Sequence, residues 1–391
     1  MKTIFKRLLF LLMVVHSVAI HGQSANSKLI PYRLGNLWGY SDQRGNIVIP
    51  TRYQEAFPFF SGVAVVRQDN HASFLDAAGN LKIPFRYDFI GNFNSDGIAL
   101  VSRSGKWGAI DNRGKEVVRL KYDGMNEFSE GYAAVKSGDK IGFVNKKGDE
   151  IIPPQYDFAA SFSEGLAMVK LNDKFGFINE KGLLAVPVQY AGATSFHDGL
   201  ALVKQDSAVG FIGKDGRIAV PFIYRAANIF SEGLAAAQKM DSVGFINESG
   251  ETVIPFRYQN ANNFREEMAL VEREGKYGFI DKNGSEVVPP RYSVANDFHE
   301  GQALVFSDAW SFITKTGTEI NLSGYTAAVS FSNGYARVQR NGLWGFIDVS
   351  GKEVIPAKYE EAGDFEGGLV MIKLDGKWGY IDSTGKEFFR N

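Results

Sequence analysis

The chain of 391 residues contains no cysteine, and it has no marked excess of charge of either sign. Without cysteine it forms neither a disulfide nor a lipid-modified cysteine behind an export signal. Its 43 basic and 44 acidic residues leave a formal net charge of -1. No global electric field therefore favours nucleic acid or an anionic bilayer, and we expect no nucleic-acid partner and no stable membrane insertion.

Long apolar runs are also scarce, and one stands out near the start of the chain. Residues 8–20 are almost wholly apolar, follow three basic residues and precede the stretch "HGQSANS". A run of about 13 residues is short of the roughly 20 that a membrane-spanning helix needs. The pattern predicts a signal peptide over residues 1–22, with a membrane anchor as the alternative. We expect a monomer that is secreted or periplasmic after cleavage near Gly22.

What the chain has in abundance is one repeated segment. The stretch "KYGFIDKNGSEVVPPRY" (276–292) returns as "KWGAIDNRGKEVVRLKY" from Lys106 and as "KWGYIDSTGKEFF" from Lys377. The Trp-Gly or Phe-Gly slot recurs every 33 to 35 residues, at positions 38, 72, 107, 141, 175, 209, 243, 277, 310, 344 and 378. We assign ten tandem repeats to residues 38–377 and partial repeats, acting as caps, to residues 23–37 and 378–391.

The period of about 34 residues also suits helical repeats, so the residues decide the class. Each unit carries several glycines and usually a proline in its middle, which disfavours helices. It also holds three short apolar runs, such as "FGFIN", "EIIPP" and "LAMVK", each bounded by turn residues. We therefore predict an all-β protein with about three short antiparallel strands per unit. The segment before the third run, such as "YDFAASFSEG", is interpreted as a compact crossover with room for one helical turn.

Fixed slots within the unit suggest physical roles. A glycine stands seven residues after each of the eleven starts, as at Gly284, which suggests a positive φ that closes a hairpin between the first two runs. A tyrosine at fifteen and a phenylalanine at twenty-one occur in all ten full units. We interpret both as buried ladders packed between units, with the tyrosine hydroxyls bonded to backbone or water. Proline at twelve, present in eight of ten units, indicates that the second strand ends there or lies at a sheet edge.

The ordered pattern "KWGFID..G..VIP..Y....F.EGLA.V" resembles the WG-containing (KWG-type) β-repeat family over about residues 30–391. The resemblance implies a repetitive β architecture, and it carries no catalytic residues to transfer. Two units depart from the pattern. The unit at Ala72 has "HASFLD" without the Trp-Gly pair, and the unit at Trp310 has Ser311 in place of glycine and lacks the proline.

Two architectures are compatible with these repeats. The chain begins its pattern with "KLIPYRLGN", like a third strand without its hairpin, and ends with a hairpin that lacks a third strand. A closed propeller joins its ends in this way. Propellers, however, usually have four to eight blades of four strands, whereas this chain has about eleven three-stranded units. We therefore predict an open superhelical, solenoid-like β array, with a closed propeller-like ring as the alternative.

No reaction centre is recognisable in the sequence. After residue 22 the only histidines are His71, His197 and His299, and none lies in a catalytic motif. His197 and His299 occupy the serine slot of "FSEG" and are interpreted as tolerated turn residues. We predict no catalytic, cofactor-binding or metal-binding residues, and the ligand-binding residues are unknown.

Two recurrent side-chain types were weighed as ligand sites. Carboxylates recur at the "EG" turn and, stacked along the array, would form an acidic stripe for calcium or a basic partner: Glu130, Glu164, Asp198, Glu232 and Glu300. No unit has the ligand spacing of a calcium loop, which favours solvated turn residues. The tryptophans would stack on sugars if exposed, but their slot also holds Phe, Tyr, Ile and Val, as at Phe175 and Val209. Exchange among apolar types indicates packing instead.

The sequence therefore favours a non-enzymatic interaction scaffold for protein, peptide or glycan partners. The alternative is a cell-envelope hydrolase or ligand-binding enzyme whose site is assembled in the irregular units. A pocket with convergent titratable groups near His71, Asp308 or Lys315 would support that alternative.

Overall fold

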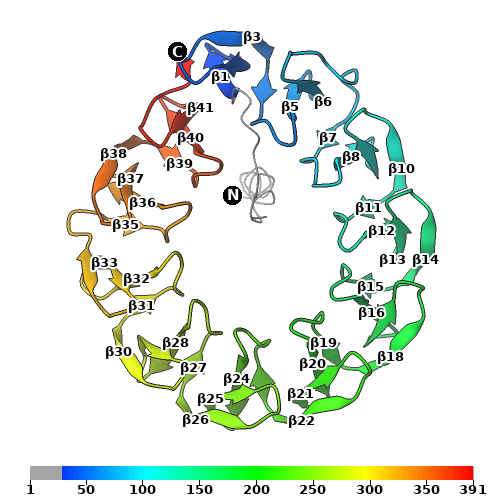
Figure 1. Cartoon of the computed structure of the whole chain (residues 1–391), viewed down its shortest axis with the longest axis vertical. Helices are drawn as coiled ribbons and strands as arrows, with labels where there is room; N and C mark the ends of the chain where they lie inside the picture. The colour runs from blue at the N-terminus through cyan, green and yellow to red at the C-terminus, as the bar shows by residue number, and fades with distance from the viewer. Residues whose placement is uncertain (1–28, 391) are drawn as a thin grey trace, which may run out of the picture.

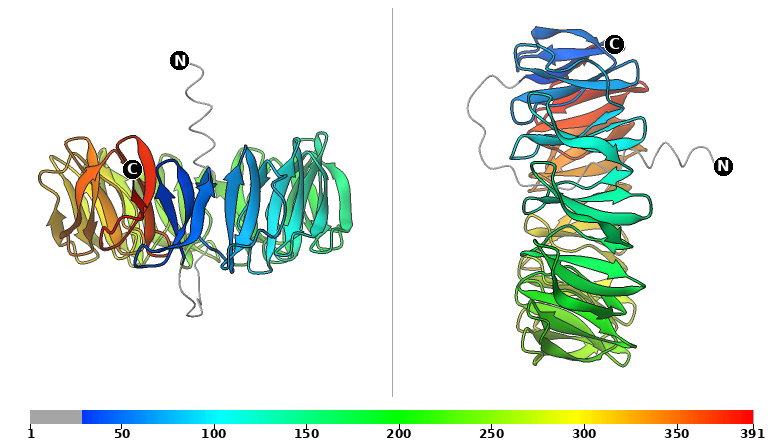
Figure 2. Two further views of the ribbon diagram at one scale, coloured as in Figure 1. Left: turned by 90° about the horizontal axis from the view of Figure 1, so that it is seen from above. Right: turned by 90° about the vertical axis from the view of Figure 1, so that its right-hand side faces the viewer.

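The computed structural model describes residues 29–390, which form 42 β-strands and no helix. The strands make eleven small sheets, here called blades, which stand side by side in a closed ring (Figure 1). Figure 2 shows the same ring from two sides as a single layer of blades. The predicted all-β class and the tandem repeats are confirmed. The predicted signal peptide lies outside the described residues.

A complete blade has four strands, which we name by position from the inside of the ring to its rim (Figure 1). The innermost strands are two residues long: β4 (Glu55–Ala56), β7 (Phe89–Ile90), β11 (Gly124–Met125), β15 (Phe158–Ala159), β19 (Gly192–Ala193), β23 (Ala226–Ala227), β27 (Asn260–Ala261), β31 (Val294–Ala295), β35 (Ala327–Ala328) and β39 (Glu361–Ala362). In the first blade the strand beside the second strand is instead the C-terminal β42 (Phe389–Arg390), which Figure 1 shows near the rim. The second strands are β1 (Ile30–Leu34), β5 (Val63–Gln68), β8 (Ile98–Arg103), β12 (Tyr132–Ser137), β16 (Leu166–Leu171), β20 (Leu200–Gln205), β24 (Leu234–Lys239), β28 (Met268–Arg273), β32 (Gln302–Phe306), β36 (Tyr335–Arg340) and β40 (Leu369–Leu374).

The remaining two positions carry the hairpin that the sequence predicts. The third strands are β2 (Leu37–Ser41), β6 (His71–Asp76), β9 (Lys106–Asp111), β13 (Lys140–Asn145), β17 (Lys174–Asn179), β21 (Ala208–Gly213), β25 (Ser242–Asn247), β29 (Lys276–Asp281), β33 (Trp310–Thr314), β37 (Leu343–Asp348) and β41 (Lys377–Asp382). The outer strands are β3 (Ile47–Tyr53), β10 (Glu116–Tyr122), β14 (Glu150–Tyr156), β18 (Leu184–Tyr190), β22 (Ile218–Tyr224), β26 (Thr252–Tyr258), β30 (Glu286–Tyr292), β34 (Glu319–Asn321) and β38 (Glu353–Tyr359).

Repeats and blades are out of phase. One repeat supplies β17 and β18 to one blade and β19 and β20 to the next, where they pair with β21 and β22 of the following repeat. The innermost strand lies in the segment predicted to be a crossover with room for a helical turn. That segment therefore contributes a fourth strand to the next blade, because its backbone pairs with the second strand of that blade, as β19 pairs with β20.

The prediction of an open array is wrong, because the two ends of the described chain meet in one blade. β42 pairs in parallel with β1, and the N–H of Gly35 donates to the carbonyl oxygen of Arg390 at 2.9 Å. The buried Arg33 donates through Nε to the Trp378 carbonyl oxygen at 2.7 Å, with its guanidinium over the Phe389 ring. The end segments that were predicted to cap an open array thus complete each other.

The hydrophobic core lies between neighbouring blades. One cluster joins Phe177, Val186 and Tyr190 of one blade to Phe196 and Ile212 of the next, and similar clusters recur round the ring. The phenylalanine ladder packs on a phenylalanine of the preceding blade, with ring centroids 4.5 to 5.0 Å apart: Phe74–Phe93, Phe143–Phe162, Phe177–Phe196, Phe211–Phe230, Phe245–Phe264, Phe279–Phe298, Phe312–Phe331 and Phe346–Phe365. Burial between units is as predicted, but the partner occupies a different slot, two residues after the repeat start.

The tyrosine ladder is also largely buried, and most of its hydroxyls form hydrogen bonds with side chains. Tyr122 donates to Glu150 Oε1 of the neighbouring outer strand at 2.7 Å, and Lys121 pairs with the same carboxylate. Burial, followed by this hydrogen bond, raises the pKa of Tyr122 to about 12. Tyr224 has the predicted backbone partner, because its hydroxyl donates to the carbonyl oxygen of Gly250 at 3.3 Å.

The glycine seven residues after each start has positive φ in all eleven units, which confirms the predicted hairpin turn. At Gly284 φ is +79°, and its N–H donates to the carbonyl oxygen of Asp281 at 2.9 Å. The Asp281 carboxylate accepts the N–H groups of Asn283 and Ser285, so the turn satisfies its own backbone. A side chain at Gly284 would also lie 3.2 Å from Ile254 of the preceding blade.

Replacing Gly284 by valine should lower the free energy of unfolding by at least about 1 kcal/mol, because a β-branched residue is strained at positive φ. Thermal unfolding measures the change. Ser285→Val, at an exposed neighbour with ordinary backbone conformation, is the matched control. Equal melting temperatures for the two variants would contradict the turn argument.

Glycine is required in the Trp-Gly pair for a different reason, which is the lack of space for a side chain. A Cβ at Gly244 would lie 2.6 Å from the carbonyl oxygen of Ile254, because the outer strand bulges directly over this glycine. Pro255 stands in that bulge on the edge strand of the sheet. Of the two alternatives predicted for proline, the edge position is correct, and a missing N–H at an edge also blunts pairing with another sheet.

The two irregular units lose this outer-strand geometry. Ser73 replaces the glycine in the second blade, its hydroxyl donates to the Ile83 carbonyl oxygen at 2.6 Å, and the sheet has three strands. Ser311 replaces it in the unit at Trp310, where the outer strand is only three residues long and pairs without a bulge. A side chain in place of the glycine of the Trp-Gly pair is therefore accompanied by loss of the outer strand at Ser73 and by a short outer strand without a bulge at Ser311.

Candidate functional site

The acidic turn residues predicted as a stripe connect one blade to the next. Each has φ near +50°, and most accept backbone N–H groups of the following blade's turn. Glu130 accepts from Glu164 and Gly165 at 2.7 and 2.8 Å, and Glu300 accepts from Asn333 and Gly334 at 2.6 and 2.8 Å. These carboxylates are thus used inside the ring's structure and are more than solvated turn residues.

Lysines of the next blade's hairpin turns complete these contacts. Lys214 Nζ lies 3.0 Å from Glu164 Oε2, and the same carboxylate accepts the N–H of Gly199 at 3.0 Å. Partial burial acts to raise the pKa of Glu164, but Lys214 and the backbone donors lower it overall. Among residues 29–390, no group of three or more His, Cys, Asp or Glu side chains is arranged to hold a metal ion.

Replacing Glu164 by alanine should lower the free energy of unfolding by about 1–3 kcal/mol, the range for hydrogen bonds to a charged group. Because the folded-state pKa is depressed, the stabilisation is present above the unfolded-state pKa and is lost as pH falls through the folded-state value. Urea unfolding at neutral and acidic pH measures both effects. The exposed Glu180→Ala is the control, and an equal, pH-independent effect of the two changes would contradict the inter-blade contact.

The three histidines remain apart. His71 begins β6 on the surface, where Nδ1 lies 2.8 Å from the carbonyl oxygen of Asp69. His197 and His299 occupy a slot in which serine bonds the next blade, as when Ser163 Oγ donates to the Phe196 carbonyl oxygen at 2.8 Å. His197 instead contacts Asp198, with Nδ1 3.2 Å from Oδ2. The serine slot therefore has a structural role that the sequence analysis did not identify.

The irregular units do not share a site. His71 lies on β6, whereas Asp308 and Lys315 flank β33 in another part of the ring (Figure 1). Asp308 is exposed, and Lys315 pairs with Glu266 of the blade before, with Nζ 3.4 Å from Oε2. The convergence of titratable groups proposed for these units is not found among the described residues.

The tryptophan slot packs against the core, as the sequence indicated. Trp38 is buried, with its ring centroid 5.9 Å from that of Tyr380 across the closing contact of the ring. Trp107 is half-buried, with its ring centroid 5.5 Å from that of Phe89.

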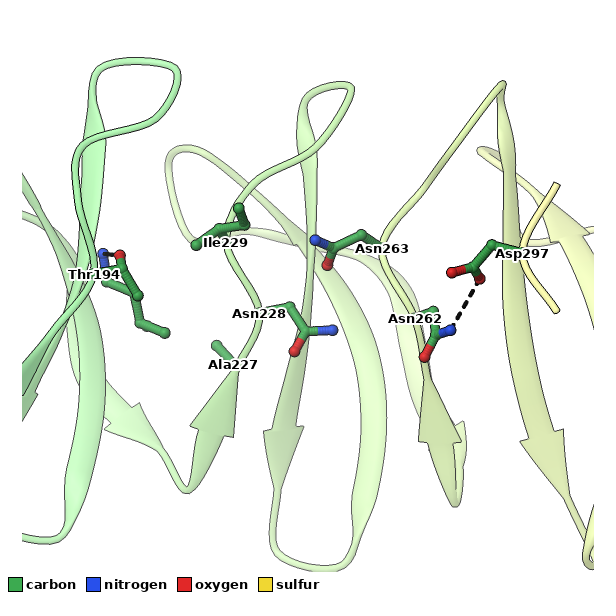
Figure 3. Close-up of a pocket in the computed structure, with 8 residues that line it drawn as sticks. Thr194, Ala227, Asn228, Ile229, Asn262, Asn263 and Asp297 are labelled. Atoms are coloured by element: carbon green, nitrogen blue, oxygen red, sulfur yellow. Dashed lines mark hydrogen bonds between the residues drawn. The ribbon is translucent and has the colours of Figure 1, made fainter. Parts of the chain in front are cut away.

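A depression with amide side chains lies on the inner side of the ring, where the segments that follow the innermost strands β19, β23, β27 and β31 meet (Figures 1 and 3). Its volume is about 450 Å³. Eight residues line it: Thr194, Leu202, Ala227, Asn228, Ile229, Asn262, Asn263 and Asp297. The lining therefore comes from four consecutive blades rather than from one loop.

Hydrogen bonds fix the amides relative to one another. Asn262 Nδ2 donates to Asp297 Oδ1 of the next blade at 2.9 Å, the contact drawn in Figure 3. Asn228 Nδ2 donates to the Ala261 carbonyl oxygen at 3.4 Å, again across a blade boundary. Asn263 Oδ1 is buried and has no hydrogen-bond partner in the described part of the chain. The depression is thus lined by amide side chains, two of which are held in place by hydrogen bonds across blade boundaries.

This depression was not predicted, although the sequence carries a signal for it. Asparagine occupies the slot nineteen residues after the start in four units, at Asn126, Asn228, Asn262 and Asn296. Three of these units are consecutive, which the ring turns into adjacent positions on its inner side. Without the blade arrangement, the recurrence was indistinguishable from ordinary turn chemistry.

In the part of the chain that the structure describes, no helix has both the length and the apolar character needed to cross a bilayer. Comparison with known families finds a match to the family described as "WG containing repeat" in ten tandem segments: residues 38–70, 73–107, 107–140, 141–175, 175–207, 210–241, 244–277, 277–308, 310–344 and 344–378. No curated protein matches the chain.

The solved structures that the chain is similar to have low sequence identity and TM-scores below 0.5. A eukaryotic initiation factor is 9% identical, with a TM-score of 0.48, over 83% of this chain and 94% of that chain. The extracellular domain of a putative hybrid two-component system from B. thetaiotaomicron is 8% identical, with a TM-score of 0.26, over 85% and 57%. A surface component of the type-IX secretion system of Porphyromonas gingivalis is 9% identical, with a TM-score of 0.26, over 91% and 65%.

Proposed function

The chain belongs to the WG-containing repeat family, and from its ring we propose that the protein is an exported, non-enzymatic scaffold that binds a partner on its inner side. The observation that carries the proposal is the amide depression. Four consecutive blades contribute to its lining, so a partner bound there contacts several repeats at once. Repeat proteins use such continuous surfaces to bind extended partners.

The chemistry of the lining supports binding without catalysis. It holds three amides, one hydroxyl and one carboxylate, and it contains no histidine, lysine or arginine. Thr194 Oγ1 already accepts the N–H of Leu202 at 3.2 Å, and Asp297 already accepts from Asn262. A nucleophile with an adjacent base and an orienting group is not assembled there. The groups are suited to hydrogen-bonding a ligand and holding it in place.

Export is proposed from the sequence of residues 1–22. The exported protein should be lighter than the precursor by the mass of the signal peptide. Mass spectrometry of the intact protein and of its N-terminal peptide measures this difference. Identical N-termini would contradict export by cleavage.

Affinity capture tests the binding function. The mature chain, residues 23–391, is immobilised and exposed to cell-envelope extract, and captured proteins and glycans are identified by mass spectrometry. We expect a partner that is retained by the ring and released when Asn228, Asn262 and Asn263 are replaced together by alanine. If the triple variant retains the partner as well as the unaltered chain does, the partner binds outside the depression. Absence of any captured partner would contradict the scaffold function.

A further inference from the structure

We propose that the amide depression binds a neutral oligosaccharide, an inference that rests on the proposed binding function and assigns the chemistry of its ligand. The depression is formed by Asn228, Asn262 and Asn263, with Asp297 at one side (Figure 3). Leu202 and Ile229 contribute apolar groups to its lining. Its volume of about 450 Å³ falls within the range of roughly 300–1,000 Å³ that is common for small-molecule sites.

The hydrogen-bonding groups match hydroxyls better than they match other ligands. A sugar hydroxyl both donates and accepts, and an amide side chain offers both functions in one plane. Asn263 Oδ1 is unpaired within the described residues but covered by neighbouring atoms, so the side chain has to turn for this oxygen to accept a hydrogen bond from a ligand. Asn262 and Asn228 each use Nδ2 for a contact to the next blade, which fixes the side chain and leaves its oxygen turned to other donors. Positioned acceptors of this kind recognise hydroxyl hydrogens.

The charge of the lining argues against acidic ligands. Asp297 is its one ionisable residue, and no lysine, arginine or histidine lines the depression. A uronate, a phosphate or a nucleic acid would bring a second negative charge toward this carboxylate without a compensating cation. A neutral sugar carries no such cost, and its C–H faces can lie against Leu202, Ala227 and Ile229.

The backbone around the depression argues against an extended peptide. Peptides commonly bind by adding a strand to an open sheet edge. Here the N–H groups of Asn228 and Asn262 already donate to the carbonyl oxygens of Ala236 and Leu270, each at 2.9 Å. The Ala261 carbonyl oxygen already accepts from Asn228. These backbone groups are therefore not available to a peptide strand.

The amide row also continues past the depression. Asn296 Nδ2 donates to Ser330 Oγ of the next blade at 3.3 Å, in the same slot as Asn228 and Asn262. A polymer of identical sugar units can meet equivalent groups on successive blades, and linked contacts raise the apparent affinity without any strong single contact. We therefore expect hexasaccharides to bind more tightly than the corresponding monosaccharides.

The test uses defined sugars as probes for the mature chain. Hexasaccharides of glucose, mannose, xylose and N-acetylglucosamine are compared with hexagalacturonate on an array and then by isothermal titration calorimetry. We expect at least one neutral hexasaccharide to bind with a Kd below about 1 mM, and hexagalacturonate to bind about tenfold more weakly or not at all. No neutral binding up to about 5 mM, or a preference for the uronate, would overturn the proposal.

Variants place the binding in the depression. Asn262→Ala with Asn263→Ala should weaken the neutral hexasaccharide about tenfold or more, because each change removes groups that pair with ligand hydroxyls. Asn126→Ala is the matched control, since Asn126 occupies the same slot outside the depression and should leave Kd unchanged. The single Asn263→Leu change preserves side-chain size and is used if the double variant unfolds at a lower temperature. Equal Kd values for all variants would overturn the site assignment.

The outcomes separate this inference from the proposed function. Capture of an envelope protein together with failure of every neutral hexasaccharide would reject the sugar ligand and leave the scaffold function intact. Failure of both the capture and the hexasaccharides would reject the two together.

Discussion

Replacing Phe196 by alanine should lower the free energy of unfolding by about 3–5 kcal/mol, the usual cost of emptying a buried phenylalanine site. Phe196 is 2% exposed, and its ring centroid lies 4.7 Å from that of Phe177 in the preceding blade. It belongs to the same cluster as Tyr190 and Ile212, which come from two different blades. The cavity would therefore weaken the contact between blades rather than the interior of one sheet.

Amide exchange across this variant tests the architecture as well as the energy. In a closed ring, separating two blades at one place also removes the constraint that holds the ends together, so protection should fall near Phe196 and also at the β1–β42 pair. Ile223→Ala, on a side chain that is 54% exposed, is the control and should leave protection unchanged. Loss confined to the blades around Phe196 would favour the open array, and a stability change below about 1 kcal/mol would contradict the burial argument.

A chain that ends at Lys386 should lose at least about 5 kcal/mol of stability, because it lacks two buried phenylalanines and the strand that closes the ring. Phe388 is fully buried, and Phe389 is 8% exposed. The carbonyl oxygen of Phe388 accepts the N–H of Arg33 at 3.2 Å. Removal of residues 387–391 therefore also leaves this buried backbone donor without its acceptor. The buried Arg33 would lose the aromatic ring beneath its guanidinium as well.

Small-angle scattering and thermal unfolding of the shortened chain measure these effects. We expect a larger radius of gyration and a lower melting temperature, since the first and last blades no longer share a sheet. Arg390→Ala is the control, because it keeps the backbone of β42 and both phenylalanines. A shortened chain with unchanged dimensions and melting temperature would show that β42 does not hold the ring closed.

Residue types that recur at fixed positions of the repeat were enough to predict its turns and strands. The strict glycine exemplified by Gly284 indicated a positive φ, and the alternation of apolar runs and turns indicated the strands, because both depend on nearest neighbours in the chain. The phenylalanine slot at Phe196 indicated burial between units. Its partner, Phe177, was not predictable, since the slot that faces it depends on how two sheets are staggered.

Closure was predicted wrongly because it is a property of the whole array. The small rotation between adjacent blades must sum to a full turn over eleven of them, and no single repeat reveals that sum. The usual range of four to eight blades then favoured the open form. The complementary ends of the repeat pattern were the correct signal, and the pairing of Arg33 with Phe389 is their structural counterpart.

The candidate site was less predictable than the fold. Glu164 was recognised as part of an acidic stripe, but one of its partners is the backbone N–H of Gly199, which a sequence does not reveal by residue type. The asparagine slot was visible, but its meaning depends on three neighbouring blades facing the same side. Side-chain identity gives the available chemistry, and the ring decides which groups meet.

The seam between β1 and β42 also sets an order of events during biosynthesis. Residues 30–34 leave the ribosome among the first of the described residues, yet the strand that pairs with them in parallel, residues 389–390, is the last described part to be made. Every other blade receives its innermost strand directly before its second strand and can assemble as the chain emerges. The first blade is therefore completed only after the last described residues have been translated, and a chain that stops earlier leaves the edge of β1 unpaired.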